Sequence, residues 1–289
     1  MDLAQLLVTG IAQGCIYGLI ALGFVLIYKA TETVNFAQGD LMMVGAFIAF
    51  TFIASLGMPY WLGLAAVIVT MALAGYALDV VLLRPISGQP QFAVVILTIS
   101  LGFVLRAIAG VVWGHNPVSF PTPFSGKMLA VGNAVISQEN VAIIVGTLLL
   151  CGLLFVFFRY TRLGVAMQAA SQNQLAAYYM GIPVKRLSST IWAISAGVAA
   201  VAGVLMAPVA LVEPQMGFLG IKAFAAAVIG GFGSLPGALL GGLIVGVGEQ
   251  LAGGYLPQGF KETSAYLLML VVLTVRPGGL FAQIQRKKV

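Results

Sequence analysis

Few side chains in this sequence have the type and spacing that catalysis requires. The single histidine, His115, lies in the segment GHNPVSF with no cysteine or acidic residue beside it, so it does not suggest a metal site or an acid–base pair. Cys15 and Cys151 each lie inside an apolar run, which is typical of packing residues rather than of a disulfide or a metal pair. No P-loop, GxSxG or HExxH pattern occurs. We therefore expect no enzyme, and no metal or cofactor bound by this chain.

Four polar residues in or beside apolar runs are more informative: Asn35, Gln38, Asp40 and Arg106. An uncompensated charge in apolar surroundings is costly, so such residues are usually paired or functional. Asp40 suits a helix start or an interface, and it equally suits a cavity on a pathway. Arg106 either pairs with an acid, such as Asp40 or Asp79, or faces a substrate. We take the four residues as candidates for a translocation path.

The composition says which elements must position these residues. The chain has 289 residues, of which 61% are hydrophobic and 8% are charged, and its mean hydropathy is +1.06. Soluble domains contain about 25% charged residues, so the sequence predicts an all-α, polytopic integral membrane protein with one transmembrane domain over residues 1–289. The net charge of +6 does not indicate nucleic acid binding, because the basic residues lie at the ends of apolar runs.

Runs of about 20 apolar residues predict the membrane-spanning helices. The expected spans cover residues 5–28, 41–58, 60–78, 92–114, 140–158, 188–212 and 263–275, with a longer run at 223–248. The second span can begin as early as Asn35. A chain that starts with its N-terminus outside places most of its 14 Lys and Arg residues on the cytoplasmic side, as the positive-inside rule expects. The tail Arg286, Lys287 and Lys288 then lies in the cytoplasm.

That orientation requires the 223–248 run to enter and leave the membrane on the same side. Gly233, Ser234, Leu235 and Pro236 favour a turn there. Two half-length helices are tolerable where protein or a water-filled cavity covers their ends, so we expect eight or nine membrane segments, including a broken or hairpin segment near 223–252. The 36 glycines suit close helix packing. Interrupted helices also line transport routes, which makes Gly231 and Gly233 further path candidates.

Two polar segments remain outside these spans. Residues 159–187 contain four basic residues and no acid, and residues 163–181 have the pattern of an amphipathic helix. Such a helix either lies on anionic lipid or docks into a groove on a cytoplasmic partner. Residues 114–139 form a proline-containing external loop that either docks a partner protein or covers the bundle.

Several segments resemble one family of permeases. The motif AAYYMG at 176–181 is similar to the EAA loop of ABC importer permeases, although Leu175 occupies the position of its glutamate. The blocks YGLIALG (17–23), TVNFAQGD (33–40), GGFGSLPGA (230–238) and RPGGLF (276–281) resemble the Liv-type branched-chain amino acid permeases, in the order expected from end to end. The resemblance covers nearly the whole chain and is strongest to the LivH type within the LivH/LivM family.

This resemblance implies a permease subunit of a binding-protein-dependent ABC importer for leucine, isoleucine and valine in the bacterial inner membrane. The implied partners are a LivM-type permease, two ATP-binding subunits that hold the ATP, and a periplasmic substrate-binding protein. Residues 159–187 would be the cytoplasmic coupling loop. The residues expected to contact the ATPases are Arg162, Gln172, Ala176, Ala177 and Gly181.

Other functions stay open at this point. Import of urea or short-chain amides shares the same sequence blocks. A secondary transporter or channel would need ion-coupling or proton-relay residues in the spans, for which only Arg106 and Asp40 are available. An intramembrane enzyme would need convergent reactive groups.

Overall fold

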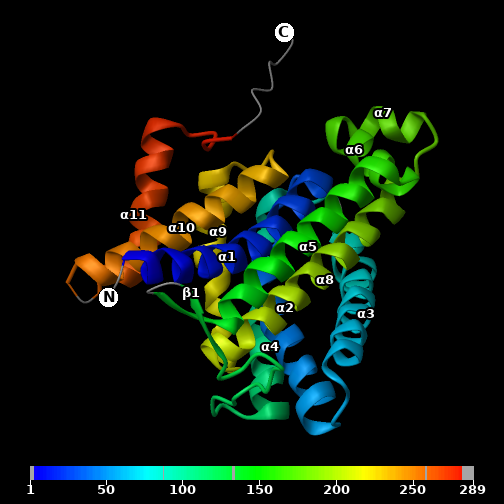
Figure 1. Cartoon of the computed structure of the whole chain (residues 1–289). Coiled ribbons are helices and arrows are strands. Elements are labelled where there is room, and N and C mark those ends of the chain that lie inside the picture. Colours follow the sequence, from blue (N-terminus) through cyan, green and yellow to red (C-terminus); the bar gives the residue numbers. More distant parts are fainter. Residues whose placement is uncertain (1–2, 87, 132–133, 258, 282–289) are drawn as a thin grey trace.

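The structure, a computed structural model, describes residues 3–86, 88–131, 134–257 and 259–281. Within them the chain is a bundle of helices (Figure 1). These are α1 (Leu3–Thr31), α2 (Gln38–Ala49), α3 (Tyr60–Leu78), α4 (Gln91–Trp113), α5 (Gln138–Tyr160), α6 (Arg162–Gln172), α7 (Gln174–Tyr179), α8 (Val184–Ala210), α9 (Leu219–Gly230), α10 (Leu235–Tyr255) and α11 (Phe260–Val275). The predicted basic tail at Arg286, Lys287 and Lys288 lies outside the described residues.

Four short helical turns extend or precede these helices. A π-helical turn, η1 (Phe50–Ser55), continues α2, and η2 (Asp79–Leu83) and η3 (Arg84–Ile86) continue α3. A 3-10 turn, η4 (Pro214–Phe218), leads into α9. Seven helices of the described chain are long and apolar enough to cross a membrane, while α9 and α11 are shorter. The predicted class, a polytopic helical membrane bundle, is confirmed.

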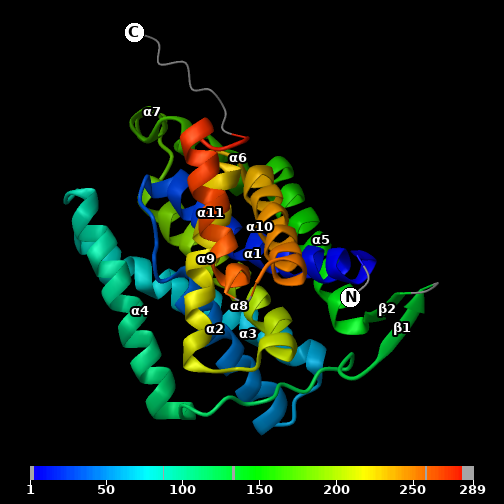
Figure 2. The same cartoon turned by 90° about the vertical axis from the view of Figure 1, so that its left-hand side faces the viewer.

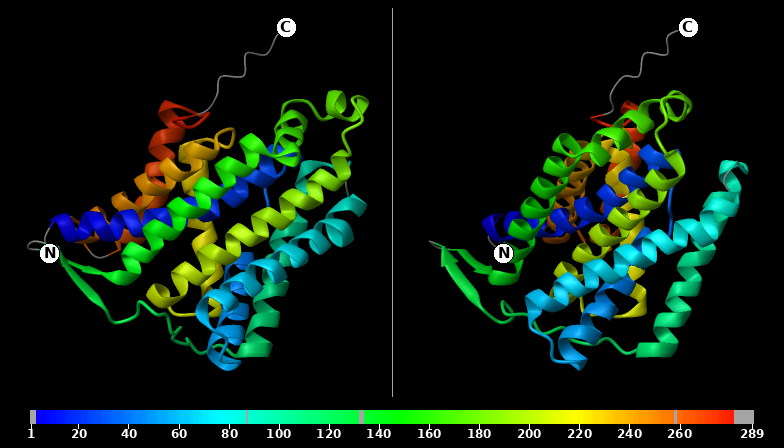
Figure 3. Two further views of the ribbon diagram at one scale, coloured as in Figure 1. Left: turned by 45° about the vertical axis from the view of Figure 1, so that its right-hand side comes forward. Right: turned by 90° about the vertical axis from the view of Figure 1, so that its right-hand side faces the viewer.

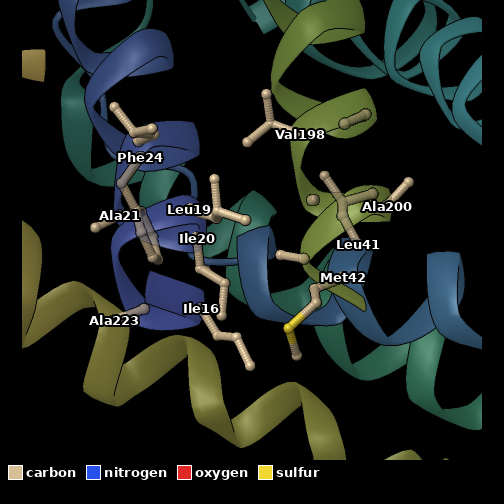
Figure 4. Close-up of a cluster of buried hydrophobic side chains, with 14 of the residues drawn as sticks. Ile16, Leu19, Ile20, Ala21, Phe24, Leu41, Met42, Val198, Ala200 and Ala223 are labelled. Atoms are coloured by element: carbon tan, nitrogen blue, oxygen red, sulfur yellow. The ribbon is translucent and has the colours of Figure 1, made fainter. Parts of the chain in front are cut away.

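Helix α1 is the centre of the bundle. Every residue of α1 from Gly14 to Ile27 is buried, and α5, α8, α9 and α10 pack around this helix (Figure 3). Side chains of α1 such as Ile16 and Phe24 form one apolar cluster with Met42 of α2, Val198 of α8 and Ala223 of α9 (Figure 4). Helix α9 therefore packs directly against α1, whereas α2 packs mainly against α8.

Glycines bring α1 and α10 into backbone contact. A Cβ added at Gly14 would lie 2.7 Å from the Cα of Leu243, and one at Gly10 would lie 2.9 Å from the Cα of Val247. Small residues allow such close approach between helices in lipid. The predicted packing role of the glycine-rich stretch is thus observed along this pair of helices.

The outer helices present apolar side chains to their surroundings. On α4 the exposed residues include Phe92, Phe103 and Val111, and on α5 they include Leu148 and Leu153. Helix α4 lies at the edge of the bundle (Figure 2). Exposed apolar faces of this extent are expected where helices meet lipid or a second membrane subunit.

The 223–252 segment is a hairpin, as predicted, but its arms are not two half-length helices. Helix α9 has 12 residues and α10 has 21, so the second arm is long enough to cross by itself. The turn covers residues 231–234, and the Ser234 hydroxyl caps α10 by accepting a hydrogen bond from Gly237 N at 3.1 Å. The returning C-terminal segment bonds to this turn through Leu280 N and the carbonyl of Ile229, at 2.8 Å.

Two predicted loops contain regular structure. The 114–139 segment includes a two-stranded antiparallel hairpin, β1 (Met128–Val131) and β2 (Ala134–Ser137), so the all-α prediction misses one small element. The helix expected over 163–181 is two helices, α6 and α7, because Asn173 adopts an extended conformation between them. Figure 3 shows α6 and α7 at one end of the bundle, called the α7 end below, and β1–β2 with the N-terminus at the other.

Candidate functional site

The first turn of α2 begins inside the bundle rather than at its surface. Asn35 and Gln38 are fully buried, and their side chains bond to each other from Asn35 Nδ2 to Gln38 Oε1, at 3.3 Å. The Asn35 Oδ1 also accepts a bond from Ala37 N at 3.1 Å. These bonds satisfy polar groups that would otherwise be costly at this depth.

Ser195 in the middle of α8 joins this turn to two long helices. Its hydroxyl lies 3.1 Å from both Gln38 Oε1 and the carbonyl oxygen of Gly23 in α1. Gln38 Nε2 in turn donates to the Ser195 carbonyl at 3.3 Å. A side chain at Gly23 would collide with the Gln38 amide, so the glycine is required for the contact.

Asp40, in the same first turn of α2, forms an ion pair with Arg106 of α4. Arg106 Nε donates to Asp40 Oδ1 at 2.5 Å and Nη2 to Oδ2 at 3.4 Å. The carboxylate side chain is 3% exposed and the arginine side chain 19%. The Phe218 ring of η4 stacks on the guanidinium, with its centroid 3.7 Å from Cζ. The carboxylate is therefore enclosed, while part of the arginine side chain stays exposed.

Two glycines make room for the Asp40 carboxylate, and a third, Gly39, lets α2 approach α9. A Cβ at Gly102 of α4 or at Gly217 of η4 would collide with the carboxylate oxygens. One at Gly39 would lie 2.7 Å from the Cα of Gly220. The starts of α2 and α9 consequently meet beside the ion pair. Helix N-termini carry partial positive charge, and interrupted helices that meet within a bundle commonly form transporter substrate sites.

The structure places four of the six predicted path candidates close together: Asn35, Gln38, Asp40 and Arg106. Of the two acids proposed as partners for Arg106, Asp40 is the one in contact. Asp79 instead bonds to the hydroxyls of Ser188 and Ser189, at 3.0 and 2.5 Å.

The two glycines named as path candidates are not part of this cluster. Gly231 and Gly233 lie at the α9–α10 turn, where a Cβ on Gly279 would be 2.6 Å from the Gly231 Cα. The φ of Gly231 is +92°, a conformation that glycine adopts without strain. At Gly231 and Gly233, the glycine-rich pattern therefore indicates a turn.

A second buried ionic group was missed by sequence reasoning. Lys222 Nζ lies 2.7 Å from Glu249 and 2.6 Å from Glu262, and Tyr17 donates to Glu249 at 2.7 Å. This group ties α1, α9, α10 and α11 together. Glu249 is 2% exposed. Lys222 and Glu249 are 27 residues apart in the chain, and a single sequence gives no signal that residues at this spacing form a pair.

The α6–α7 segment is a mostly exposed surface at its own end of the bundle. Four of the five expected coupling residues are exposed and Ala177 is buried; the exposed ones are Arg162, Gln172, Ala176 and Gly181. Beside them Leu175, Tyr179 and Met180 are 66%, 76% and 82% exposed. Such an apolar patch on a short helix is typical of a surface that another protein covers.

One side-chain bond caps α7 and another holds it to the bundle. Asn173 caps it by accepting from Ala176 N at 2.9 Å. Gln174 Nε2 donates to the carbonyl of Ala30 at the end of α1, at 2.6 Å. A force on α7 would therefore act directly on the central helix.

A polytopic bundle with interrupted helices around a buried ion pair, and an exposed apolar helix at one end, defines a membrane transport protein. The family model "Branched-chain amino acid transport system / permease component" matches residues 6–275, and the chain belongs to this family.

Individual relatives agree over almost the full length. The high-affinity branched-chain amino acid transport system permease protein LivH of Salmonella typhimurium is 33% identical, covering 99% of this chain and 97% of the relative. LivH of Escherichia coli K12 and BraD of Pseudomonas aeruginosa have the same identity and coverage. No solved structure matches the chain.

Proposed function

We propose that this chain is a permease subunit of an ABC importer that carries leucine, isoleucine and valine across the bacterial inner membrane. The observation that carries the proposal is the 33% identity to high-affinity branched-chain amino acid permeases over nearly the whole length of both proteins. The chain itself forms the path and hydrolyses nothing. ATP is bound and hydrolysed by two partner subunits, and a homologous LivM-type permease completes the membrane part.

The path passes the cluster of Asn35, Gln38, Asp40 and Arg106. An amino acid in transit carries one carboxylate and one ammonium group, and an ion pair that is buried on one side offers a partner for each. Binding here must be weak, because a path that held its substrate firmly would not release it. Substrate selection belongs largely to a periplasmic binding protein that delivers the amino acid at the end opposite α7.

Helix α7 is the contact for an ATP-binding subunit. Its exposed apolar residues Leu175, Tyr179 and Met180 suit a groove on that subunit, in the manner of an amphipathic helix in a groove. Closure of the ATPase pair moves α7 and, through Gln174, the end of α1. Nucleotide drives transport only by binding one conformation of the assembly better than the other.

The α7 end faces the cytoplasm and the N-terminus lies outside. Basic residues support this orientation, since Arg159, Arg162, Lys185 and Arg186 all lie at the α7 end or in its connecting loops and cytoplasmic loops carry excess Lys and Arg. The described C-terminal segment, which packs on the α9–α10 turn, then lies on the cytoplasmic side as well.

Competition in cells tests the cargo. A strain without its own branched-chain amino acid permeases would receive this chain with its partner subunits, and uptake of labelled leucine would be measured. We expect saturable uptake that unlabelled isoleucine and valine reduce and that urea leaves unchanged. Uptake of urea or a short-chain amide without uptake of leucine would agree with an importer but refute the proposed substrate.

A further inference from the structure

A polar cavity of about 250 Å³ lies at the α7 end, away from the Asp40–Arg106 pair. Its walls come from the end of α1, the η2–η3 turns, the start of α4, α7 and the start of α8. No residue of the Asn35–Arg106 cluster lines it. The cavity is somewhat smaller than the pockets of about 300–1,000 Å³ that hold drug-sized ligands, which suits a smaller molecule such as a single amino acid.

The lining carries charges of both signs. Asp79 is held by Ser188 and Ser189, and its Oδ2 lies 3.6 Å from Arg84 Nε. That Nε is buried and donates no hydrogen bond to any described residue, an unusual state for a buried donor. Lys185, exposed at the start of α8, adds a second cation to the rim, and the exposed Glu32 adds a second acid.

Apolar side chains form the rest of the wall. Leu83, Val94 and Trp192 line the cavity together with the charged groups, and Trp192 is almost fully buried. A ligand that fits this lining has one anionic group, one cationic group and an aliphatic part. This is the chemistry of an aliphatic amino acid.

The cavity also adjoins α7, which contributes one residue to its lining. Gln174 of α7 lines it and bonds to the Ala30 carbonyl of α1, while Gln91 of α4 bonds to the Glu32 carbonyl at 3.3 Å on the facing wall. A ligand held between these walls would stabilise the present position of α7, and a ligand can shift a conformational equilibrium only through such differential binding.

We propose that this cavity is a second amino acid site, which binds a zwitterionic aliphatic amino acid from the α7 side and restrains α7. The carboxylate would bind Arg84 and Lys185, the ammonium group would bind Asp79, and the side chain would pack on Leu83, Val94 and Trp192. The effect on transport rests on the proposed importer function, whereas binding to the cavity does not.

Protection of an introduced cysteine tests binding without relying on activity. Gln89 is exposed and lines the cavity, so Gln89→Cys in the purified complex with its partner subunits provides a thiol for maleimide labelling. We expect millimolar leucine to slow this labelling at least fivefold, while labelling of Arg186→Cys, an exposed residue outside the lining, stays unchanged. Equal labelling of Gln89→Cys with and without leucine would overturn the proposal.

Analogues and charge variants test the assigned chemistry. Leucine should protect at least tenfold better than 4-methylpentanoate, which lacks the amino group, or 3-methylbutylamine, which lacks the carboxylate. Adding Lys185→Ala should weaken protection at least tenfold, and the neighbouring Arg186→Ala should leave it unchanged. Protection that survives Lys185→Ala would instead refute the second site.

The proposed restraint on α7 is tested separately, by the rate of ATP hydrolysis. In the reconstituted complex, leucine on the α7 side should slow ATP hydrolysis at least twofold, and Lys185→Ala should remove this effect. Leucine-protected labelling without any change in ATP hydrolysis would refute the restraint. Failure of leucine uptake with intact protection would count against the importer function and leave the site in place.

Discussion

At the scale of single residues, the proposed path depends on one ion pair. Asp40 is nearly buried, its charge is matched by Arg106, and backbone at Gly102 and Gly217 encloses the carboxylate. The sequence alone identified both residues as unusual, because charge within an apolar run is rare. It could not choose between Asp40 and Asp79 as the partner, since that choice depends on how α2, α4 and η4 pack.

Removing one charge of this pair should destabilise the protein. Arg106→Gln leaves the Asp40 carboxylate buried without its counter-charge, and breaking a buried pair in this way costs about 3–5 kcal/mol. We expect a clearly lower melting temperature for the purified complex. The double variant Asp40→Asn with Arg106→Gln should recover part of the loss, because no charge is then left unpaired. A single variant as stable as the parent would show that the pair is not held in this environment.

At the scale of elements, the interface of α1 with α10 is determined by glycines. Their number in the sequence predicted close packing, but the partners could not be read from it, because contacts between α1 and α10 join residues more than 220 positions apart. A hairpin turn at residues 233–236 was predictable from Gly, Ser and Pro. The observed turn lies at 231–234, because Leu235 and Pro236 already form the start of α10. The unequal lengths of its arms depend on η4 and the start of α9 packing against α2.

A larger residue at Gly14 should prevent this packing. Its Cβ would lie 2.7 Å from the backbone of Leu243, and backbone cannot move aside as a flexible side chain can, so we expect a cost of about 1–3 kcal/mol or more for Gly14→Leu. The control is Gly152→Leu on exposed α5, where nothing lies within 4 Å of the added Cβ. The yield of monodisperse protein should fall for the first variant and stay near the parent for the second.

The turn after α7 gives a prediction for coupling. Gly181 has a φ of +81°, where a β-branched residue is strained by roughly 1–2 kcal/mol, while asparagine tolerates this region. Gly181→Val should therefore disturb α7 and lower the amount of leucine taken up per ATP hydrolysed. Gly181→Asn should have a smaller effect. Normal uptake per ATP hydrolysed in the valine variant would argue against α7 as the coupling element.

At the scale of the whole molecule, the pattern of apolar runs was enough to predict a polytopic bundle, and the ordered sequence blocks were enough to indicate the family. Both follow from local sequence, since span length and charge bias are properties of segments. The break between α6 and α7 at Asn173, the β1–β2 hairpin and the Lys222–Glu249 contact depend on tertiary packing or on short-range capping that periodicity does not reveal.

The central claim is that this chain carries amino acids only as part of an ATP-driven assembly. Uptake of labelled leucine should be measured in proteoliposomes that contain this chain, its partner permease and the two ATP-binding subunits. Each of these components, ATP and the binding protein would be omitted in turn. We predict that uptake requires every one of them. Leucine uptake by this chain alone, driven by an ion gradient, would contradict the account and indicate a secondary transporter.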